Sequence, residues 1–383
     1  MQITSRPVAT GSAFLSMFFL GVGVAIVGAT ARAVGLAPSE IGYLIAAQNV
    51  GFGVSVVVSG GLADRHSKPV ILAVGLAMLG FSFAVLYRSD LLLVNLAVML
   101  VMGGGMGVAE AVTDAWLLEM YSRGESRLIQ VNHLAVTVGS IAITIYLMAL
   151  ELDWRTSLGQ VATALGVLAV LSALLRPAVR PVQRTATSTG FRNLSNDAGI
   201  ILFALAAMGT VGLEIGTAGV ITTFAVELRG VDTATAQLML ALYLVGLAVG
   251  RIVVGVFGGR SRPVRIIVAA AALAFLSASL LFLVPLSYAL MPVPLFVLGV
   301  AVGPMLPLAI AAAGLRYRHA AGTAMGIVKA AIPVGGVAIP GLVGLVSDAV
   351  SFPVALSLFP AAALFVLIIA GMAARLTRGR CPC

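Results

Sequence analysis

Five ionisable side chains lie inside apolar segments that are long enough to cross a membrane: Glu110, Asp114, Glu214, Arg251 and Lys329. An ionisable group inside a bilayer carries a high free-energy cost unless it is paired. Each of the five is therefore a candidate for proton transfer, for ion pairing or for binding a charged solute.

Glu110 and Asp114 are four residues apart, so a helix places them on one face. Two carboxylates in such proximity do not both ionise at low cost, and one of them is therefore able to hold a proton. The alternative is a structural role, in which both acids pair with arginines near the end of their helix. The spacing alone leaves both interpretations open.

Glu214 lies near the middle of its segment, between Gly212 and Gly216. Glycines there permit close approach of a substrate or of another helix. We expect Glu214 to alternate between a protonated form and a form paired with Lys329 or with substrate. Lys329 has the alternative of a purely structural ion pair. For Arg251 we favour a structural role, with its long side chain reaching towards the membrane interface.

Neutral polar side chains in the apolar segments are further candidates for contact with a solute. They are Gln48, Asn49, Asn132 and Tyr243. His133 is either a ligand of this kind or a packing residue. The spacing of His, Cys, Asp and Glu along the chain predicts no metal site and no cofactor, and the absence of Walker-type and Ser-His-Asp patterns predicts that the protein is not an enzyme.

The elements that position these residues are membrane helices. The chain has 383 residues, of which 60% are hydrophobic and 10% are charged, and its mean hydropathy is +1.11. A soluble surface needs far more charge, and the basic residues form no continuous patch of the kind that binds nucleic acid. Twelve apolar spans are expected, at 12–33, 40–61, 70–88, 91–118, 128–150, 154–176, 197–225, 234–257, 264–285, 289–314, 322–345 and 352–374.

Basic residues predict the orientation of these spans. With the N-terminus in the cytoplasm, the inner loops and ends hold 17 of the 23 Lys and Arg residues. These 17 are Arg6, Arg65, Lys68, Arg123, Arg127, Arg176, Arg180, Arg184, Arg192, Arg260, Arg262, Arg265, Arg316, Arg318, Arg375, Arg378 and Arg380. By the positive-inside rule, we expect both termini in the cytoplasm of a multi-pass protein of the plasma (cell inner) membrane.

The chain divides into two halves with a shared pattern. Residues 177–196 are polar and Pro- and Arg-containing, which predicts a cytoplasmic linker between a half at 1–176 and a half at 197–383. A shift of about 195 positions superposes glycines of the two halves, including Gly51 on Gly246. Two parallel repeats of six helices are therefore expected.

The loop after the second span resembles the signature of the major facilitator superfamily, Gly-x-Leu-Ala-Asp-Arg-x-Gly-Arg-Lys. Five residues match it: Gly60, Leu62, Ala63, Asp64 and Arg65. Lys68 keeps the charge of the signature's Arg, whereas Ser67 and Pro69 depart from the pattern. The resemblance implies an all-α membrane protein with the major facilitator fold, working as a transporter.

In this interpretation the loop is a gate. Asp64 accepts hydrogen bonds from backbone N–H groups at a helix start, and Arg65 or Lys68 pairs with Glu119. Gly60 allows the helices to approach closely. The alternative is that Arg65 and Lys68 only anchor the loop on the cytoplasmic side.

A weaker resemblance concerns the fucose-permease-like and siderophore-bypass-like branches, which often carry an acid in helix four, a His in helix five and a Glu in helix seven. Glu110, His133 and Glu214 occupy those places. The predicted function is a secondary active transporter of a small polar or anionic solute, working as a monomer by alternating access and coupled to H⁺. The alternatives are a drug or lipophile efflux antiporter and a non-transporting membrane receptor.

Overall fold

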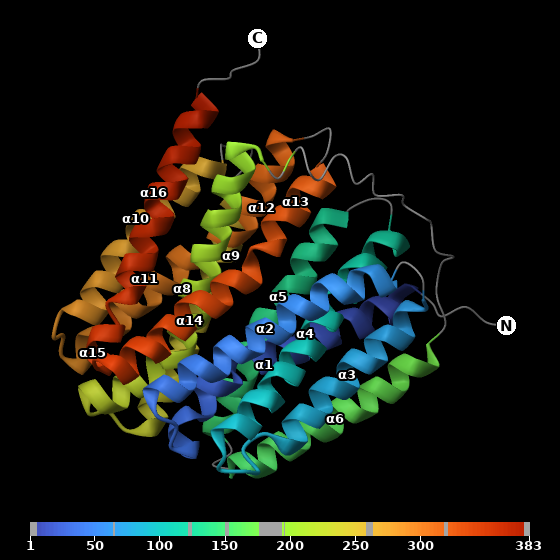
Figure 1. The fold of residues 1–383 in the computed structure, drawn as a ribbon, viewed down its shortest axis with the longest axis horizontal. Helices are drawn as coiled ribbons and strands as arrows, with labels where there is room; N and C mark the ends of the chain where they lie inside the picture. The colour runs from blue at the N-terminus through green and yellow to red at the C-terminus, as the bar shows by residue number, and fades with distance from the viewer. Residues whose placement is uncertain are drawn as a thin grey trace. The chain divides into compact units, whose positions relative to one another are not determined.

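A computed structural model describes residues 6–63, 66–121, 125–149, 153–175, 194, 196–257, 263–317 and 321–378. These residues form helices and no strand (Figure 1). The first helices are α1 (Arg6–Val34), α2 (Pro38–Ala63), α3 (Lys68–Val85), α4 (Leu92–Met120), α5 (Glu125–Ala149) and α6 (Trp154–Leu174). The later ones are α8 (Ala198–Arg229), α9 (Thr233–Phe257), α10 (Pro263–Leu283), η1 (Tyr288–Leu290), α11 (Pro292–Val302), α12 (Met305–Arg316), α13 (Ala321–Ala330), α14 (Ile332–Ala349), α15 (Phe352–Ala355) and α16 (Leu358–Arg378).

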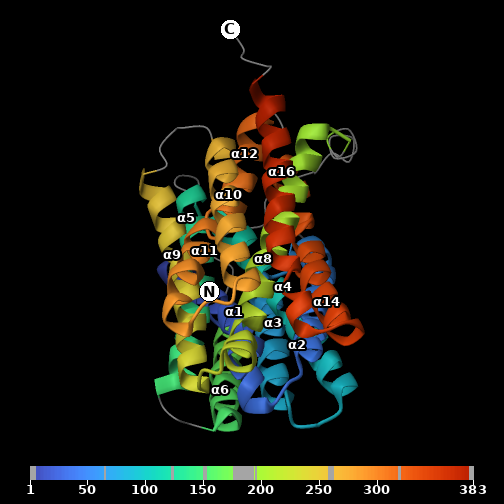
Figure 2. The same ribbon diagram turned by 90° about the vertical axis from the view of Figure 1, so that its left-hand side faces the viewer.

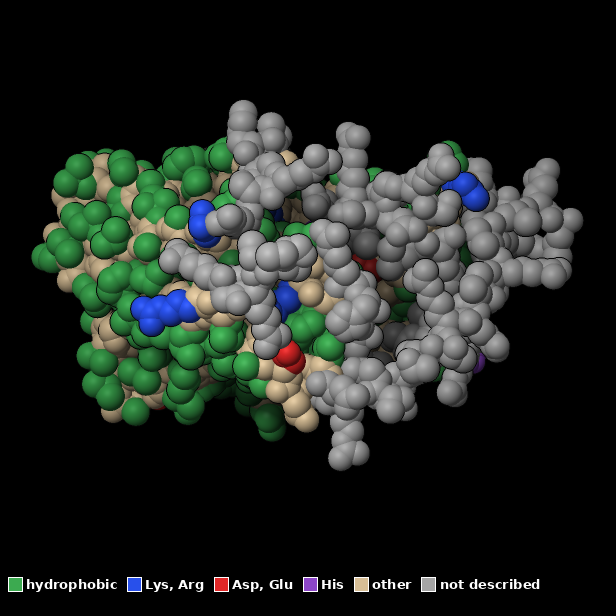
Figure 3. All heavy atoms as spheres, turned by 90° about the horizontal axis from the view of Figure 1, so that it is seen from above, with side chains coloured by type: hydrophobic (Ala, Val, Ile, Leu, Met, Phe, Trp, Pro, Cys, Tyr) green, Lys and Arg blue, Asp and Glu red, His purple; other side chains and the backbone are tan. Residues whose placement is uncertain are grey.

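Eleven helical segments among the described residues are long and apolar enough to cross a membrane. The 26-residue helix α2 coincides with the remaining expected span, so the twelve-span prediction agrees with the helices observed. Large hydrophobic side chains stay exposed on their surfaces, such as Leu93 and Leu174. Figure 3 shows hydrophobic side chains over much of the described surface on the viewed side, with few charges. Such a surface matches hydrocarbon rather than water.

The tenth and eleventh expected spans are broken at prolines, and the twelfth is divided near its start into α15 and α16. The tenth is divided into α11 and α12 around Gly303 and Pro304, and the eleventh is divided into α13 and α14 just before Pro333. Proline has no backbone N–H, so it leaves the carbonyl four residues earlier without its helical donor. Breaks of this kind expose backbone acceptors inside a membrane helix, where protein groups must satisfy them.

The chain separates into two compact units. One comprises Met1–Gly35 and Ala46–Thr185, and the other comprises Leu36–Ile45 and Ala186–Cys383. The later boundary lies within residues 177–196, the expected linker, most of which is outside the described residues. The first turns of α2 therefore pack with the second unit, where Tyr43 Oη donates to Asp348 Oδ2 over 2.6 Å.

Glycines create close helix packing in each unit, and the two sets of contacts correspond. In the first unit, glycines of α2 and α4 meet backbone carbonyls at Gly51–Leu100, Gly103–Gln48 and Gly107–Phe52. In the second unit, α9 and α11 make the same contacts at Gly246–Phe296, Gly299–Tyr243 and Gly303–Leu247. The members of each matched pair are about 195 positions apart, as the sequence repeat predicted. A side chain at any of these glycines would prevent the helices from approaching.

A hydrophobic cluster forms the core of the second unit at one end. It joins α8, α10, α12, α13 and α16 through buried residues that include Phe203, Ile267, Ala313 and Val328. Figure 2 shows α10 and α16 running side by side in this unit. The cluster is formed mostly from small and aliphatic side chains, so ionisable groups buried in this unit stand out as candidates for function.

Candidate functional site

Glu214 on α8 forms an ion pair with Arg251 on α9. The distance between Arg251 Nη2 and Glu214 Oε1 is 2.7 Å, and the two side chains are only 20% and 19% exposed. We expected Lys329 to be the partner of Glu214 and Arg251 to reach towards the interface. The structure differs on both points, because α8 and α9 pack together and bring Arg251 from a distant sequence position to the acid.

A backbone carbonyl at the break between α11 and α12 holds Arg251 in this position. Arg251 Nε donates to Gly303 O over 3.0 Å. In a regular helix that carbonyl would accept from residue 307, but Pro307 has no N–H to donate. The guanidinium therefore satisfies an acceptor that proline leaves free. Pro307, four residues after Gly303, is the sequence signal for this free acceptor, but it does not identify Arg251 as the donor.

One oxygen of Glu214 has no hydrogen-bond partner. Oε2 is buried and unpaired, while Oε1 accepts from Arg251. The flanking glycines serve helix packing, since Gly212 meets Gly335 O and Gly216 meets the ring of Phe359. Glu214 therefore lies in a tightly packed region with one acceptor position left for a proton or for another donor.

Tyr243 contacts Glu214 directly, and Lys329 lies on a different helix, α13. Tyr243 is fully buried, and its hydroxyl donates to the backbone carbonyl of Glu214 over 3.3 Å, so it connects α9 to α8. Lys329 is half-buried in the last turn of α13, next to the break before Pro333. The ion partner of Glu214 is thus on α9 and not on α13.

A second polar cluster lies between α4 and α5 in the first unit. Asp114 Oδ1 accepts from Asn132 Nδ2 over 3.0 Å, and Asp114 Oδ2 lies 3.3 Å from His133 Nε2. Asn132 Nδ2 also approaches Thr113 Oγ1 at 3.2 Å. Glu110 joins the group, since ligand atoms of Glu110, Asp114 and His133 all lie within 4.8 Å of one another. The spacing of residues along the sequence does not reveal this group, because two packed helices bring its members together.

The remaining polar candidates of the first unit are packing residues or neighbours of them. Gln48 is 2% exposed and donates from Nε2 to Gly23 O over 2.9 Å, which connects α2 to α1. Its Nε2 also lies 3.4 Å from Met102 Sδ on α4. Asn49 beside it is buried as well. The amide of Gln48 thus contacts two neighbouring helices, α1 and α4.

The predicted gating loop is only partly visible. Asp64 and Arg65 lie outside the described residues, as do the side-chain surroundings of Gly60 and Glu119. Lys68 is described, begins α3 and is 4% exposed. The gate therefore stays a prediction.

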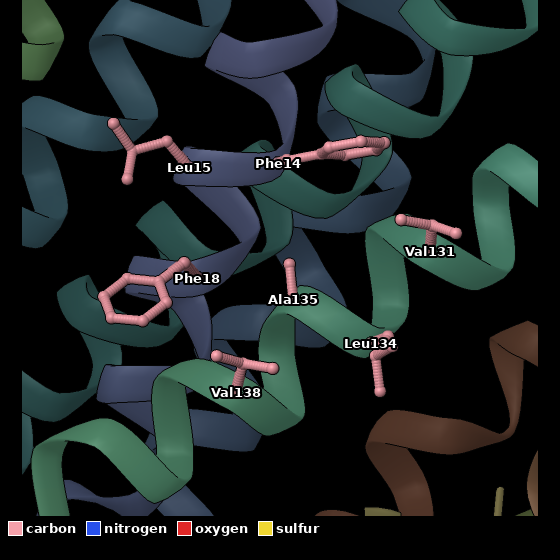
Figure 4. Close-up of a pocket in the computed structure, with 7 residues that line it drawn as sticks. All are labelled: Phe14, Leu15, Phe18, Val131, Leu134, Ala135 and Val138. Carbon is pink, nitrogen blue, oxygen red and sulfur yellow. The ribbon is translucent and has the colours of Figure 1, made fainter. Parts of the chain in front are cut away.

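An apolar groove runs between α1 and α5 (Figure 4). Its lining is entirely hydrophobic: Phe14, Leu15, Phe18, Val131, Leu134, Ala135 and Val138. It offers no side-chain donor, acceptor or charge for a polar solute. The two clusters of polar side chains, on α8 and α9 and on α4 and α5, remain the candidate sites.

Comparisons with known proteins agree with this architecture. The membrane sensor protein UhpC of Escherichia coli (strain K12) is 27% identical over 332 residues, which cover 76% of this chain and 74% of UhpC. The structure of a bacterial homologue of the human lysosomal transporter Spinster, inward-facing and unoccupied, superposes with a TM-score of 0.79 at 14% identity over 97% of this chain and 98% of that one. The nucleoside transporter NupG superposes with a TM-score of 0.77 at 12% identity over 95% and 98%. A profile of the Major Facilitator Superfamily matches residues 8–228, more than half of the sequence, and the chain therefore belongs to that superfamily.

Proposed function

We propose that the protein is a secondary active transporter that moves a small polar or anionic solute across the plasma membrane by alternating access, coupled to H⁺ through Glu214 and Arg251. The observation that carries the proposal is the buried ion pair with one unpaired carboxylate oxygen, Glu214 Oε2. Intramembrane charges of this kind mark proton and substrate pathways in transporters.

The pair offers a simple exchange of partners. Protonation of Glu214 on Oε2 removes its negative charge and weakens its hold on Arg251. The guanidinium then has a positive charge and N–H donors available for a carboxylate or phosphate of the solute. The total charge is the same before and after this exchange, so proton and anion bind together at little electrostatic cost.

Coupled binding of this kind implies symport. The state that carries both ligands and the state that carries neither each place a negative group against Arg251, and these states change orientation most readily. The state with a protonated Glu214 and no solute removes the carboxylate that balances the charge of Arg251, which is unfavourable. Proton and solute would therefore cross in the same direction.

The coupling test is Glu214→Gln in purified protein reconstituted into vesicles. The amide cannot exchange a proton, so accumulation driven by a pH gradient should be lost. Counterflow exchange of solute should continue, because it requires binding and reorientation without net proton movement. Normal pH-driven accumulation by the variant would exclude Glu214 as the coupling residue. Glu110→Gln is the matched control, because it neutralises an intramembrane acid of the other unit, and its loss of coupling would transfer the role to Glu110 and Asp114.

A second candidate function is sensing, which the relation to UhpC favours. A thermal-shift screen against sugars, organic acids and cationic drugs identifies solutes that bind the folded protein. Solutes that stabilise the protein and accumulate in vesicles support transport. Solutes that stabilise it and do not cross the membrane support a sensor, and selective binding of lipophilic cations supports a drug exporter.

A further inference from the structure

Three side chains from α4 and α5 assemble a group with the composition of a metal site. Glu110 and Asp114 contribute carboxylate oxygens and His133 contributes a ring nitrogen, all within 4.8 Å of one another. The two acids lie one helical turn apart on α4, and His133 faces them from α5. A metal pattern along the sequence is absent because the histidine is 19 positions from Asp114.

The geometry between Asp114 and His133 already suits two ligands of one ion. Their Oδ2 and Nε2 atoms are 3.3 Å apart. Ligands at about 2.0–2.2 Å from a tetrahedral ion are separated by about 3.3–3.5 Å. Glu110 is only half-buried, so rotation of its side chain can bring its oxygen closer without moving the helices.

Asn132 provides a second, independent observation. It is fully buried, and its Nδ2 donates to Asp114 Oδ1 over 3.0 Å, which holds the other carboxylate oxygen towards His133. Such hydrogen bonds to a ligating carboxylate orient it in metal sites. The Oδ1 of the same amide has no hydrogen-bond partner, and a buried oxygen of this kind is unfavourable unless a cation or a bound water satisfies it.

The charge of the group and the types of its ligand atoms limit which ions can bind. As metal ligands, two deprotonated carboxylates and one neutral imidazole carry a charge of minus two together, which a divalent cation neutralises. Imidazole nitrogen with carboxylate oxygen suits Zn²⁺, Co²⁺ and related ions better than Na⁺ or Ca²⁺, which prefer oxygen alone. We infer that Glu110, Asp114 and His133 form a binding site for a divalent transition-metal ion, positioned by Asn132.

This site is independent of the proposed proton coupling at Glu214, because the two clusters belong to different units. A metal-binding result therefore leaves the coupling hypothesis untouched, and failure of either one does not decide the other. The site also requires deprotonated carboxylates and a neutral imidazole, as metal ligands generally do.

The test is a titration of the purified full-length protein with Co²⁺, followed by its visible ligand-field absorption. The protein should carry no polyhistidine tag, and Cys381 and Cys383 should be changed to Ser, because cysteine thiolates are metal ligands in their own right. We expect one equivalent of Co²⁺ to bind and Zn²⁺ to displace it. No saturable binding, or binding of many equivalents without a defined spectrum, would overturn the inference.

Variants of single residues test which side chains bind the ion. His133→Ala and Asp114→Asn should each weaken Co²⁺ binding at least about tenfold, and Asn132→Ala should weaken it about 10–100-fold while leaving the ligand set and the form of the spectrum in place. His66→Ala is the matched control, since His66 is an exposed histidine outside the cluster, and it should bind as the parent does. If Asp114→Asn does not fold, Glu110→Gln serves in its place. Unchanged affinity in the His133 variant, or a loss confined to the His66 variant, would contradict the proposed site.

Discussion

The Glu214–Arg251 pair gives the most direct quantitative test of the structure. At 2.7 Å, an effective dielectric constant of about 20 gives a Coulomb attraction of about 6 kcal/mol. Desolvation of the two groups offsets much of this, and hydrogen bonds to charged groups contribute about 1.5–3 kcal/mol net. Because both side chains remain about one-fifth exposed, we expect a coupling energy of about 2 kcal/mol.

A double-mutant cycle measures that coupling. Glu214→Leu, Arg251→Met and the double variant are unfolded in mixed micelles, and their free energies of unfolding are compared with that of the parent. The hydrogen bond from Arg251 to Gly303 is lost in both variants that lack Arg251, so its contribution cancels. Each single variant should be destabilised by about 2–4 kcal/mol, and the double variant by about 2 kcal/mol less than the sum of the two single effects.

The chain supplies a matched control for this cycle. Asp153 and Arg155 are 4.0 Å apart and each 54% exposed, so their coupling should be no more than about 0.5 kcal/mol. A coupling energy for Glu214 and Arg251 as small as that of the control would refute the claim that they form a buried pair. The claim would also be refuted if the two single variants lowered the free energy of unfolding equally and the double variant lowered it by the sum of the two.

Three further predictions concern other parts of the chain. Asp64→Asn should slow transport in vesicles more than it lowers expression, and an unchanged rate would remove the gating role. A cysteine placed within 176–196 should react with an impermeant reagent only from the cytoplasm and one at Ser351 only from outside; labelling of both from one face would exclude the twelve-span topology. A hydrogen bond from Tyr317, helped by the N–H of Gly199, lowers the pKa of Asp197 below its usual value. Its stabilising contribution is therefore complete above the ordinary carboxyl pKa and is lost as pH falls through the lowered one, so Asp197→Asn should flatten the acid side of the stability curve below the ordinary carboxyl pKa.

The number and placement of the helices followed from the sequence because hydrocarbon imposes a simple requirement on each span. About 20 apolar residues must be continuous, and charges collect between the spans. The proline breaks inside the tenth and eleventh spans were less predictable, since a Pro in a membrane helix is tolerated where neighbours satisfy the freed carbonyl. At Gly303 that neighbour is Arg251, whose position relative to the break depends on how α9 packs against α11.

The candidate residues were easier to predict than their partners. Glu214 is identified as a candidate from the sequence alone, because an acidic side chain in an apolar span carries a high free-energy cost. Its partner was expected to be Lys329, the lone lysine within a span. Partner choice is a tertiary property, however, and depends on which helices are neighbours and which faces meet. The same reason explains why His133 and Asp114, which are 19 positions apart, form a contact that spacing does not reveal.

The two halves share their helix packing but differ in their buried charges. The glycines and the charged residues therefore support different conclusions. The glycine–carbonyl contacts of α2 with α4 recur between α9 and α11 at an offset of about 195 positions. At that offset the counterpart of Arg251 is Val56, an apolar residue, so the ion pair of the second unit has no equivalent charge in the first. The glycines are therefore explained by helix packing common to both repeats, whereas the ion pair is not needed to build the repeat. Arg251 has a structural contact at the break after α11, whereas the carboxylate of Glu214 has one oxygen without a hydrogen-bond partner, so Glu214 is the member of the pair on which the proposed proton coupling depends.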